Sequence, residues 1–242
     1  LNSHHQLMAL SEAQLAELIR TQVMLAIDEI RVDYPYTLTN RFRAIEIARI
    51  SAQIGKWLAL EKTRSPFAVT SREQTVEIEL AELKIKLKID RIDTLVDGRQ
   101  IIIDYKTGKV SPSEWFGDRP DKPQLPLYSL VLAKQQLAGI AFAQLRVDQI
   151  AFSGITVEEN LLPKVKSFEK MTQTQEIANW PTVIMNWQRV LENLALQFLS
   201  GEATVNPKKY PETCQYCSLQ ALCRINEATI LSDIEFNPET EA

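Results

Sequence analysis

Two aspartates and a lysine occupy positions from which their side chains could act together. Asp90 ends a stretch in which lysines alternate with apolar residues, and Asp104 and Lys106 end the apolar run that follows Asp97-Gly98. Side chains alternate between the two faces of a strand, so Asp104 and Lys106 share a face, as do Asp90 and the preceding lysines. A tight turn at Asp97-Gly98 would make the two strands neighbours. The sequence therefore predicts that both carboxylates and the lysine converge on one patch.

Two carboxylates beside a lysine suit the hydrolysis of phosphodiesters. Carboxylate oxygens are the ligands that Mg²⁺ prefers, and this ion keeps several of its waters. A bound metal lowers the pKa of water and neutralises the charge that builds up on a phosphate. A lysine beside it can orient or deprotonate the attacking water, or stabilise the developing charge. The strip of Lys84, Lys86 and Lys88 would then contact backbone phosphates without reading the base sequence.

The same residues have a plainer interpretation, in which strand aspartates and a nearby lysine are structural or face solvent. Asp104 weakens this interpretation because it follows the apolar run Ile101-Ile102-Ile103 of a strand with a central character. Burying a carboxylate there is costly unless it is paired or binds a cation. A chemical role accounts better for Asp104.

Helical patterns precede the strands that carry these residues. Ser11 and Gln14 fit a capping box at the start of a first helix, which Pro35 ends. Asn40 is the expected N-cap of a second helix, whose apolar residues recur near a 3.6-residue period. Residues 1–70 are therefore expected to form an N-terminal helical part.

Strand patterns come next along the chain. Residues 75–105 show a period of two and predict a three-stranded antiparallel meander. After a loop rich in glycine and proline, we expect a helix over 124–137, a strand over 144–152 and a long helix over 182–199. These elements indicate an α/β domain over 71–200.

All three cysteines, Cys214, Cys217 and Cys223, fall in one short segment of the C-terminal region 201–242. Their odd number is a poor basis for disulfides, and the C-x2-C-x5-C spacing suits thiolate ligands of one metal centre. We therefore expect a reducing, cytoplasmic compartment. A zinc knuckle on an unrelated α/β domain is one alternative, and free thiols are another.

The bulk composition excludes little. Hydrophobic residues make up 45% and charged residues 24%, as is usual for a globular protein, and no apolar run approaches the ~18 residues of a membrane span. The formal net charge of −4 does not decide about nucleic acid, because a local basic strip or a bound cation reverses the sign at one site. The first residue is Leu1 rather than Met, which suggests a fragment of a longer chain.

Four motifs in this order resemble the RecB-family nucleases of the PD-(D/E)XK superfamily. The paired motifs are Lys88-Ile89-Asp90-Arg91-Ile92-Asp93 and Ile103-Asp104-Tyr105-Lys106-Thr107-Gly108. Gln124 and Tyr128, four residues apart and thus on one helical face, are similar to the third motif. The cysteine segment resembles the C-terminal part of the iron–sulfur staple in AddB-like members. The similarity covers most of the chain, from about Arg49 to the last cysteine, and the combination is highly specific.

The resemblance implies a restriction-endonuclease-like fold, with a mixed sheet flanked by helices, and a Mg²⁺- or Mn²⁺-dependent deoxyribonuclease. It further implies an exonuclease of DNA repair or recombination that acts on DNA, with a helicase subunit as partner and no membrane. Asp90 and Asp104 would ligate the metal, Lys106 would be the catalytic lysine, and Gln124 and Tyr128 would shape the site or touch DNA. The α/β region would be the nuclease core, and the cysteines would hold a 4Fe–4S cluster in the full-length protein.

The sequence departs from the family in two ways. A staple uses four cysteines, and the first, upstream one is absent from this chain. Family members also place a metal-binding histidine on an earlier helix, whereas His4 and His5 are the only histidines and are expected to be exposed terminal residues. Truncation explains both departures, since both missing groups would precede Leu1.

Some roles stay open. Asp93 is expected to pair with Arg91 or Arg99 rather than to bind metal, and Glu73 is either a site residue or a solvated charge. Tryptophans are expected in the core or as loop anchors, with Trp115-Phe116 as the place where a base could stack. A catalytically inactive DNA-binding or scaffolding module of a helicase–nuclease complex is the alternative function. The intact pair of aspartates and lysine argues against it.

Overall fold

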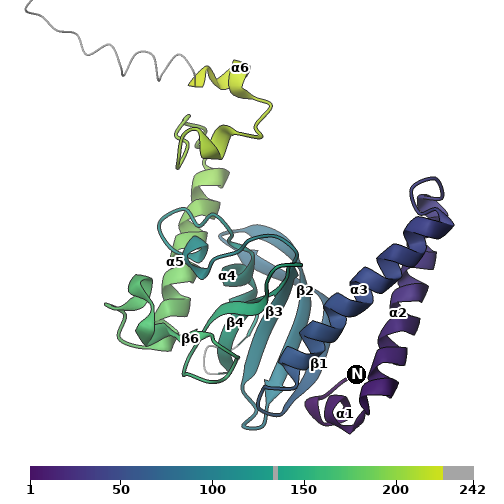
Figure 1. Ribbon diagram of the computed structural model, residues 1–242. Coiled ribbons are helices and arrows are strands. Elements are labelled where there is room, and N and C mark those ends of the chain that lie inside the picture. Colours follow the sequence, from purple (N-terminus) through teal and green to yellow (C-terminus); the bar gives the residue numbers. More distant parts are fainter. Residues whose placement is uncertain (133–135, 226–242) are drawn as a thin grey trace, which may run out of the picture. The chain divides into compact units, whose positions relative to one another are not determined.

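The structure is a computed structural model that describes residues 1–132 and 136–225. The chain divides into two compact units, Leu1–Asn193 and Leu194–Ala242. The first unit contains a sheet and the helices around it, and the second contains the cysteine segment (Figure 1).

A six-stranded sheet with strands in sequence order forms the centre of the first unit. The first three strands are antiparallel neighbours, the third and fourth are parallel, the fourth and fifth antiparallel, and the fifth and sixth parallel. The sheet is therefore mixed, as expected. The strands are β1 (Phe67–Leu80), β2 (Leu83–Leu95), β3 (Gln100–Lys106), β4 (Leu137–Leu145), β5 (Ile150–Thr156) and β6 (Lys166–Ser167).

Two long helices, α2 and α3, run as an antiparallel hairpin ahead of the sheet (Figure 1). A short helix precedes them, another follows β3, and a long one follows β6. The α-helices are α1 (His4–Ala9), α2 (Glu12–Asp33), α3 (Asn40–Glu61), α4 (Gln124–Ser129), α5 (Trp180–Leu199) and, in the second unit, α6 (Gln220–Cys223), with short 3-10 helices that include η1 (Pro112–Trp115) and η4 (Glu212–Cys214).

The starts of the two long helices follow from short polar side chains. The predicted capping box is confirmed: the Ser11 hydroxyl accepts from the backbone N–H of Gln14, whose side chain accepts from the Ser11 N–H. The predicted cap of α3 is wrong by one residue. Thr39 is the N-cap and accepts from the Phe42 N–H, while Asn40 is the first helical residue. Thr39 serves because its hydroxyl reaches an N–H that lacks a partner within the helix.

The antiparallel meander of β1, β2 and β3 is confirmed, although β1 begins earlier than expected, at Phe67. Asp97-Gly98 forms the turn between β2 and β3, where Gly98 has a φ of 87° and its N–H donates to the Leu95 carbonyl. Glycine fits here because residues with a Cβ atom rarely adopt a positive φ. The turn brings Asp90 next to the end of β3.

The expectations for residues 124–152 are wrong in two respects. The helix ends at Ser129, and Leu137 already begins β4; residues 133–135 lie outside the described part. The expected strand over 144–152 contains the turn between β4 and β5, in which Arg146 and Gln149 exchange backbone hydrogen bonds. The strand β4 is buried on both faces, and such a continuous apolar run has no period that separates it from a helix.

Hydrophobic clusters cover both faces of the sheet. One face packs against α4 and α5 through residues that include Ile102, Phe142 and Trp187. The other packs through Ile101 and Ile103 in a cluster that contains Trp57 of α3. A third cluster fills the space between α1, α2 and α3. The α/β fold with helices on both sides of the sheet is thereby confirmed.

The tryptophans lie in this core, as predicted for most of them. Their side chains are at most 4% exposed.

Within the described residues, no helix combines the length and the apolar character that crossing a membrane requires.

Candidate active site

Asp104 is a carboxylate at the end of a strand that is otherwise apolar. Its side chain is 1% exposed, and the three isoleucines before it are fully buried. One carboxylate oxygen, Oδ2, lies 2.6 Å from Nζ of Lys106. The other, Oδ1, is buried and has no hydrogen-bond partner among the described residues. An unpaired buried polar atom costs about 1–3 kcal/mol, so Asp104 Oδ1 marks a place where a further partner would stabilise the site.

Asp90 reaches the same region because strands β2 and β3 separate there. Their ladder runs from Thr94↔Gln100 to Arg91↔Ile103 and goes no further. The next rung would pair Asp90 with Asp104. Instead, the half-buried Asp90 accepts a hydrogen bond from the Tyr105 N–H through its Oδ2, at 2.9 Å. The carboxylate thus takes the position of a backbone acceptor and stands beside Asp104.

A second irregularity lies on the other side of Asp90. The β1–β2 register pairs Arg72 with Arg91 and Gln74 with Ile89, which leaves Glu73 between them with a φ of 49°. Such a φ is strained for a residue other than glycine. The register of β1 against β2 is the same before and after Glu73 and shifts between Val69 and Ser71, so the irregularity opposite Asp90 is confined to the backbone conformation of Glu73.

Lys106 is held by a chain of hydrogen bonds that begins on α4. Its Nζ donates to Oε1 of Gln124 at 3.0 Å, and Nε2 of Gln124 donates to the hydroxyl of Tyr128 at 2.5 Å. That hydroxyl donates in turn to the backbone carbonyl of Lys88 on β2, also at 2.5 Å. Gln124 and Tyr128 share a face of α4 because they are one turn apart. The structure brings all five residues, Asp90 included, together.

The electrostatics of the site follow from burial next to charge. Burial raises the pKa of Asp104; the Lys106 ammonium opposes this rise, and the neighbouring Asp90 adds to it. Burial also raises the pKa of the Tyr128 hydroxyl, while its hydrogen bond with Gln124 acts in the opposite direction. Two carboxylates that disfavour each other's charge are stabilised by any cation placed between them.

The residues present fit a divalent cation with water among its ligands. Asp104 offers a buried oxygen without a partner, and Asp90 offers a second carboxylate next to it. In the described part of the chain, no three histidine, cysteine, aspartate or glutamate side chains come together as a metal-ligand cluster. Two carboxylates suffice for Mg²⁺, which keeps several waters and is bound through one or two protein carboxylates.

Asp93 belongs to a buried ion network on the other face of the sheet. It is fully buried and contacts Arg91 Nε at 2.6 Å and Arg64 Nη1 at 2.8 Å. Both arginines also contact Glu61 at the end of α3, Arg64 at 2.6 Å and Arg91 at 2.7 Å. The predicted pairing of Asp93 with Arg91 is confirmed, whereas Arg99 pairs with Asp97 and Glu158 at the surface.

The sequence interpretation missed Arg64 and Glu61 as partners of this network. Glu61 gave a signal, because it falls on the apolar face of α3, where a charge needs a partner. Arg91 also donates to the Tyr105 hydroxyl at 2.9 Å. The network thus connects α3 with the two strands that carry the site.

The lysine strip on β2 is matched by glutamates on β1. The register places Lys84 opposite Glu79 and Lys86 opposite Glu77, and Lys88 forms a salt bridge with Glu73. The strip is exposed, as expected, but its charge is neutralised across the hairpin. The expectation that it contacts phosphates is therefore not supported. Glu73 is a solvated ion-pair partner at the edge of the site.

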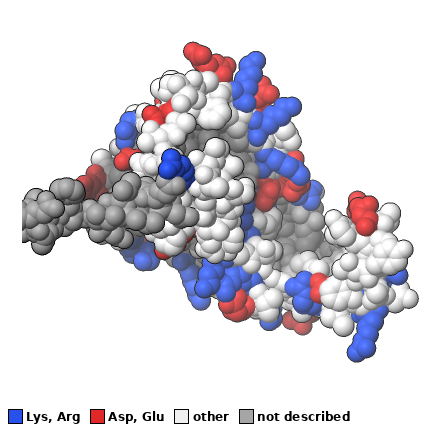
Figure 2. Space-filling model, turned by 90° about the horizontal axis from the view of Figure 1, so that it is seen from above, with Lys and Arg blue, Asp and Glu red and all other residues white. Residues whose placement is uncertain are grey.

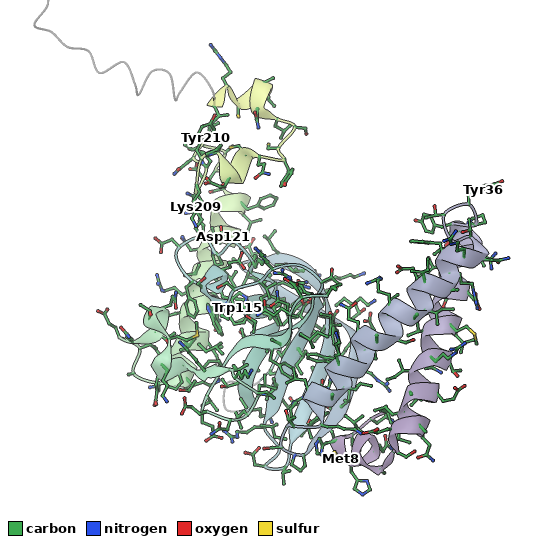
Figure 3. All side chains as sticks on the ribbon, in the orientation of Figure 1. Met8, Tyr36, Trp115, Asp121, Lys209 and Tyr210 are labelled. Atoms are coloured by element: carbon green, nitrogen blue, oxygen red, sulfur yellow. The ribbon has the colours of Figure 1, made fainter. Side chains whose placement is uncertain are left out.

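Trp115 cannot serve as a stacking platform. Its side chain is fully buried and packs against Phe142 and Trp187, at ring distances of 5.1 and 6.4 Å. Figure 3 shows it inside the body of the first unit. Phe116 is half-buried and packs against Trp187 at 5.7 Å. The expectation that a base could stack at this pair is therefore wrong for Trp115.

His4 is not the exposed terminal residue that the sequence suggested. It lies on α1, is half-buried, contacts the Lys62 carbonyl through Nε2 at 3.2 Å and packs edge-on against Phe67. An edge strand can bind a preceding segment, and here Val69 donates to the Asn2 carbonyl. His5 is exposed as expected.

The cysteines belong to the second unit. Cys214 ends η4, Cys223 ends α6, and all three thiols are free. The Cys217 N–H donates to the Cys214 carbonyl at 3.1 Å, which forms a tight turn between these two residues.

The chain belongs to the PD-(D/E)XK nuclease superfamily, whose family profile matches residues 1–224. Two solved structures resemble it at low identity. The crystal structure of SSO0001 is 16% identical, with a TM-score of 0.36, over 85% of this chain and 84% of that one. A candidate exonuclease from Eubacterium rectale is 18% identical, with a TM-score of 0.39, over 90% of this chain and 76% of that one. No curated protein matches.

Proposed function

We propose that this chain is a Mg²⁺- or Mn²⁺-dependent DNA nuclease of the RecB/AddB type, an exonuclease that acts in DNA repair or recombination. One observation carries the proposal: Asp104 is a buried carboxylate that keeps an unpartnered oxygen next to Asp90 and Lys106. A purely structural aspartate would have its buried oxygens satisfied. Membership in a nuclease superfamily supports the same chemistry.

Asp90 and Asp104 are the residues that would hold the divalent cation. When bound, the cation lowers the pKa of water and neutralises charge on the phosphate. The two carboxylates fix where the attacked phosphate lies. The Tyr105 N–H, which donates to Asp90, keeps that carboxylate turned toward β3.

Lys106 is the proposed catalytic lysine. Its ammonium lies beside the carboxylate of Asp104, and its side chain is one-third exposed, so Lys106 contacts both the buried anion and the solvent from which DNA arrives. From there it orients the attacking water or stabilises the negative charge that develops on the phosphate. Gln124 and Tyr128 act as positioning residues, because they connect the lysine to the backbone of β2.

The cysteines are proposed to contribute to a 4Fe–4S cluster in a longer protein, with a fourth cysteine supplied from outside this sequence. Free thiols at Cys214, Cys217 and Cys223 are available for ligation. Iron and sulfide absorb visible light and zinc does not, so the colour of anaerobically purified full-length protein distinguishes a cluster from a zinc knuckle. A helicase subunit is the proposed partner, and this rests on the resemblance of the motifs alone.

The experiment is degradation of DNA with Mg²⁺ or Mn²⁺ by the wild type, by Asp104→Asn and by the surface control Asp97→Asn. Linear single- and double-stranded DNA should be degraded by the wild type and the control but not by Asp104→Asn. Covalently closed circles should resist, since an exonuclease needs an end. Linear DNA that is bound but left uncut with either metal would favour a DNA-binding module without turnover.

A further inference from the structure

Two shallow depressions adjoin on the surface next to the active site. The first, of about 520 Å³, lies between the loop that contains Lys109 and the facing ends of β4 and β5. The second, of about 280 Å³, lies between β5 and the segment 164–173. Phe152 and Ser153 line both, so the two form one groove. We call it the β5 groove.

The walls of the β5 groove carry mainly positive charge. Arg146 and Lys170 are paired with acidic residues outside the groove, while Lys109, Lys164 and Lys166 are exposed and form no salt bridge within the described part of the chain. Among the described residues that line it, the acidic one is Glu114, whose carboxylate is already bound by Lys122 and by the Ser111 N–H.

This concentration of charge is a local feature. The chain as a whole carries a net charge of −4, and the face in Figure 2 shows basic and acidic side chains interspersed. In the lysine strip on β2, Lys84 and Lys86 lie opposite Glu79 and Glu77, and Lys88 forms a salt bridge with Glu73. Three unpaired lysines in one groove therefore give it a positive potential that the paired strip lacks.

The β5 groove is connected to the active site by the rungs of the sheet. Lys106 pairs with Gln144, and Asp104 pairs with Phe142 two rungs away. Across β4, these rungs continue to Ala151 and Ser153 of β5. Neighbouring strands lie about 4.8 Å apart, so the groove begins roughly 10 Å from the carboxylate of Asp104.

Gln144 connects the two sites directly. It lines the groove and donates through Nε2 to the Gly108 carbonyl, at 3.0 Å. This hydrogen bond fixes the loop that leaves β3 after Lys106. A hydrogen bond therefore joins the wall of the groove to the loop that follows the catalytic strand.

We infer that the β5 groove binds the backbone phosphates of the DNA strand that is cut, on one side of the bond that Lys106 and the two aspartates attack. The inference rests on the proposed function, because it names where that function's substrate lies. Lysines act as point charges toward phosphates and read no base sequence. The groove therefore increases affinity for any DNA sequence and leaves the chemical step to Lys106.

The test compares Lys164→Ala/Lys166→Ala with Lys84→Ala/Lys86→Ala, which removes the same two charges from the neutralised strip. Binding of a fluorescein-labelled single-stranded oligonucleotide of about 16 nucleotides, the upper site size of single-strand-binding folds, is measured by anisotropy in EDTA. Measurements span about 50–200 mM salt, because each phosphate contact adds about 0.7 to the slope of log affinity against log salt. Single-turnover cutting at saturating enzyme is measured in parallel with Mg²⁺.

The groove variant should lose about 1.4 from the salt slope and at least about tenfold in affinity at 0.1 M salt, while the strip variant stays near the wild type. At saturating enzyme, the single-turnover cutting rate of the groove variant should match that of the wild type. Equal affinity losses in both variants, unchanged affinity in the groove variant, or no binding by the wild type would each overturn the inference. A wild type that binds through the groove without cutting would instead overturn the proposed nuclease and leave the groove standing.

Discussion

Lys106 on β3 and Gln124 on α4 are joined by a 3.0 Å hydrogen bond in which the ammonium is the donor. The same ammonium lies 2.6 Å from the buried carboxylate of Asp104. A helix on one face of the sheet therefore sets the direction of a lysine at the end of a strand. The position of Lys106 depends on both the carboxylate and the amide.

Replacing the amide should slow cutting without loss of the fold. Gln124→Leu keeps a side chain of similar size but removes the acceptor for Lys106, so the lysine samples other rotamers. We expect the single-turnover rate to fall about tenfold, equivalent to ~1.4 kcal/mol of barrier, with little change in DNA affinity. Gln124→Glu keeps an acceptor and should retain more activity. Equal rates for wild type and Gln124→Leu would contradict the positioning role.

The unpartnered oxygen of Asp104 predicts stabilisation by divalent cations. Mg²⁺ at about 100 times its Kd would stabilise the wild type by about 2.7 kcal/mol, or roughly 5–10 °C in Tm. Asp104→Asn removes the anionic ligand, so its Tm should rise far less. Thermal unfolding with Mg²⁺ and with EDTA measures this. Equal Mg²⁺-dependent shifts in both proteins would mean that the ion binds elsewhere.

The pH dependence of stability follows from the raised pKa of Asp104, which has burial as its main cause. When the pKa of a carboxyl group is higher in the folded state than in the unfolded state, the folded protein still holds the proton at pH values where the unfolded chain has lost it. Stability then falls as pH rises from about 3.9, the usual aspartate value, through the folded pKa. Without metal, Asp104→Asn should lack this loss and be the more stable protein at neutral pH. Denaturant unfolding in EDTA across that range would show the two curves diverge as pH rises; parallel curves would exclude a raised pKa.

The buried network around Arg91 predicts a large stability effect from a residue outside the site. Arg91→Met leaves Glu61 and Asp93 buried with only Arg64 between them, and breaking a buried ion pair costs about 3–5 kcal/mol. Arg99→Met, in an exposed pair, should change little. Denaturant unfolding measures both. A loss below about 1 kcal/mol for Arg91→Met would show that the network contributes little.

Much of the site could be predicted because it is local in sequence. Strand alternation and one tight turn suffice to bring Asp90, Asp104 and Lys106 together, and helical spacing suffices for Gln124 and Tyr128. The proximity of α4 to Lys106 depends on tertiary packing, which no local sequence pattern specifies. Gln124 and Tyr128 could be assigned to the site only because they resemble the third motif of the family.

Other features depend on contacts between distant segments. Arg64 reaches Asp93, and Glu61 reaches Arg91, across about thirty residues of chain, so no spacing rule connects them. The register of β1 against β2 places glutamates opposite lysines of the strip and so offsets its positive charge. This register could have been predicted from the sequence, because the turn at Ala81-Glu82 determines which glutamate faces which lysine.

Replacing Lys106 tests directly whether catalysis takes place at this site. Single-turnover cutting of an end-labelled linear oligonucleotide is compared for wild type, Lys106→Ala and the exposed control Lys84→Ala, each with Mg²⁺ and with EDTA. We expect Mg²⁺-dependent cutting by the wild type and the control, and a loss of at least about 10²-fold for Lys106→Ala with DNA binding retained. Wild-type cutting rates in Lys106→Ala would contradict the assignment of catalysis to this site.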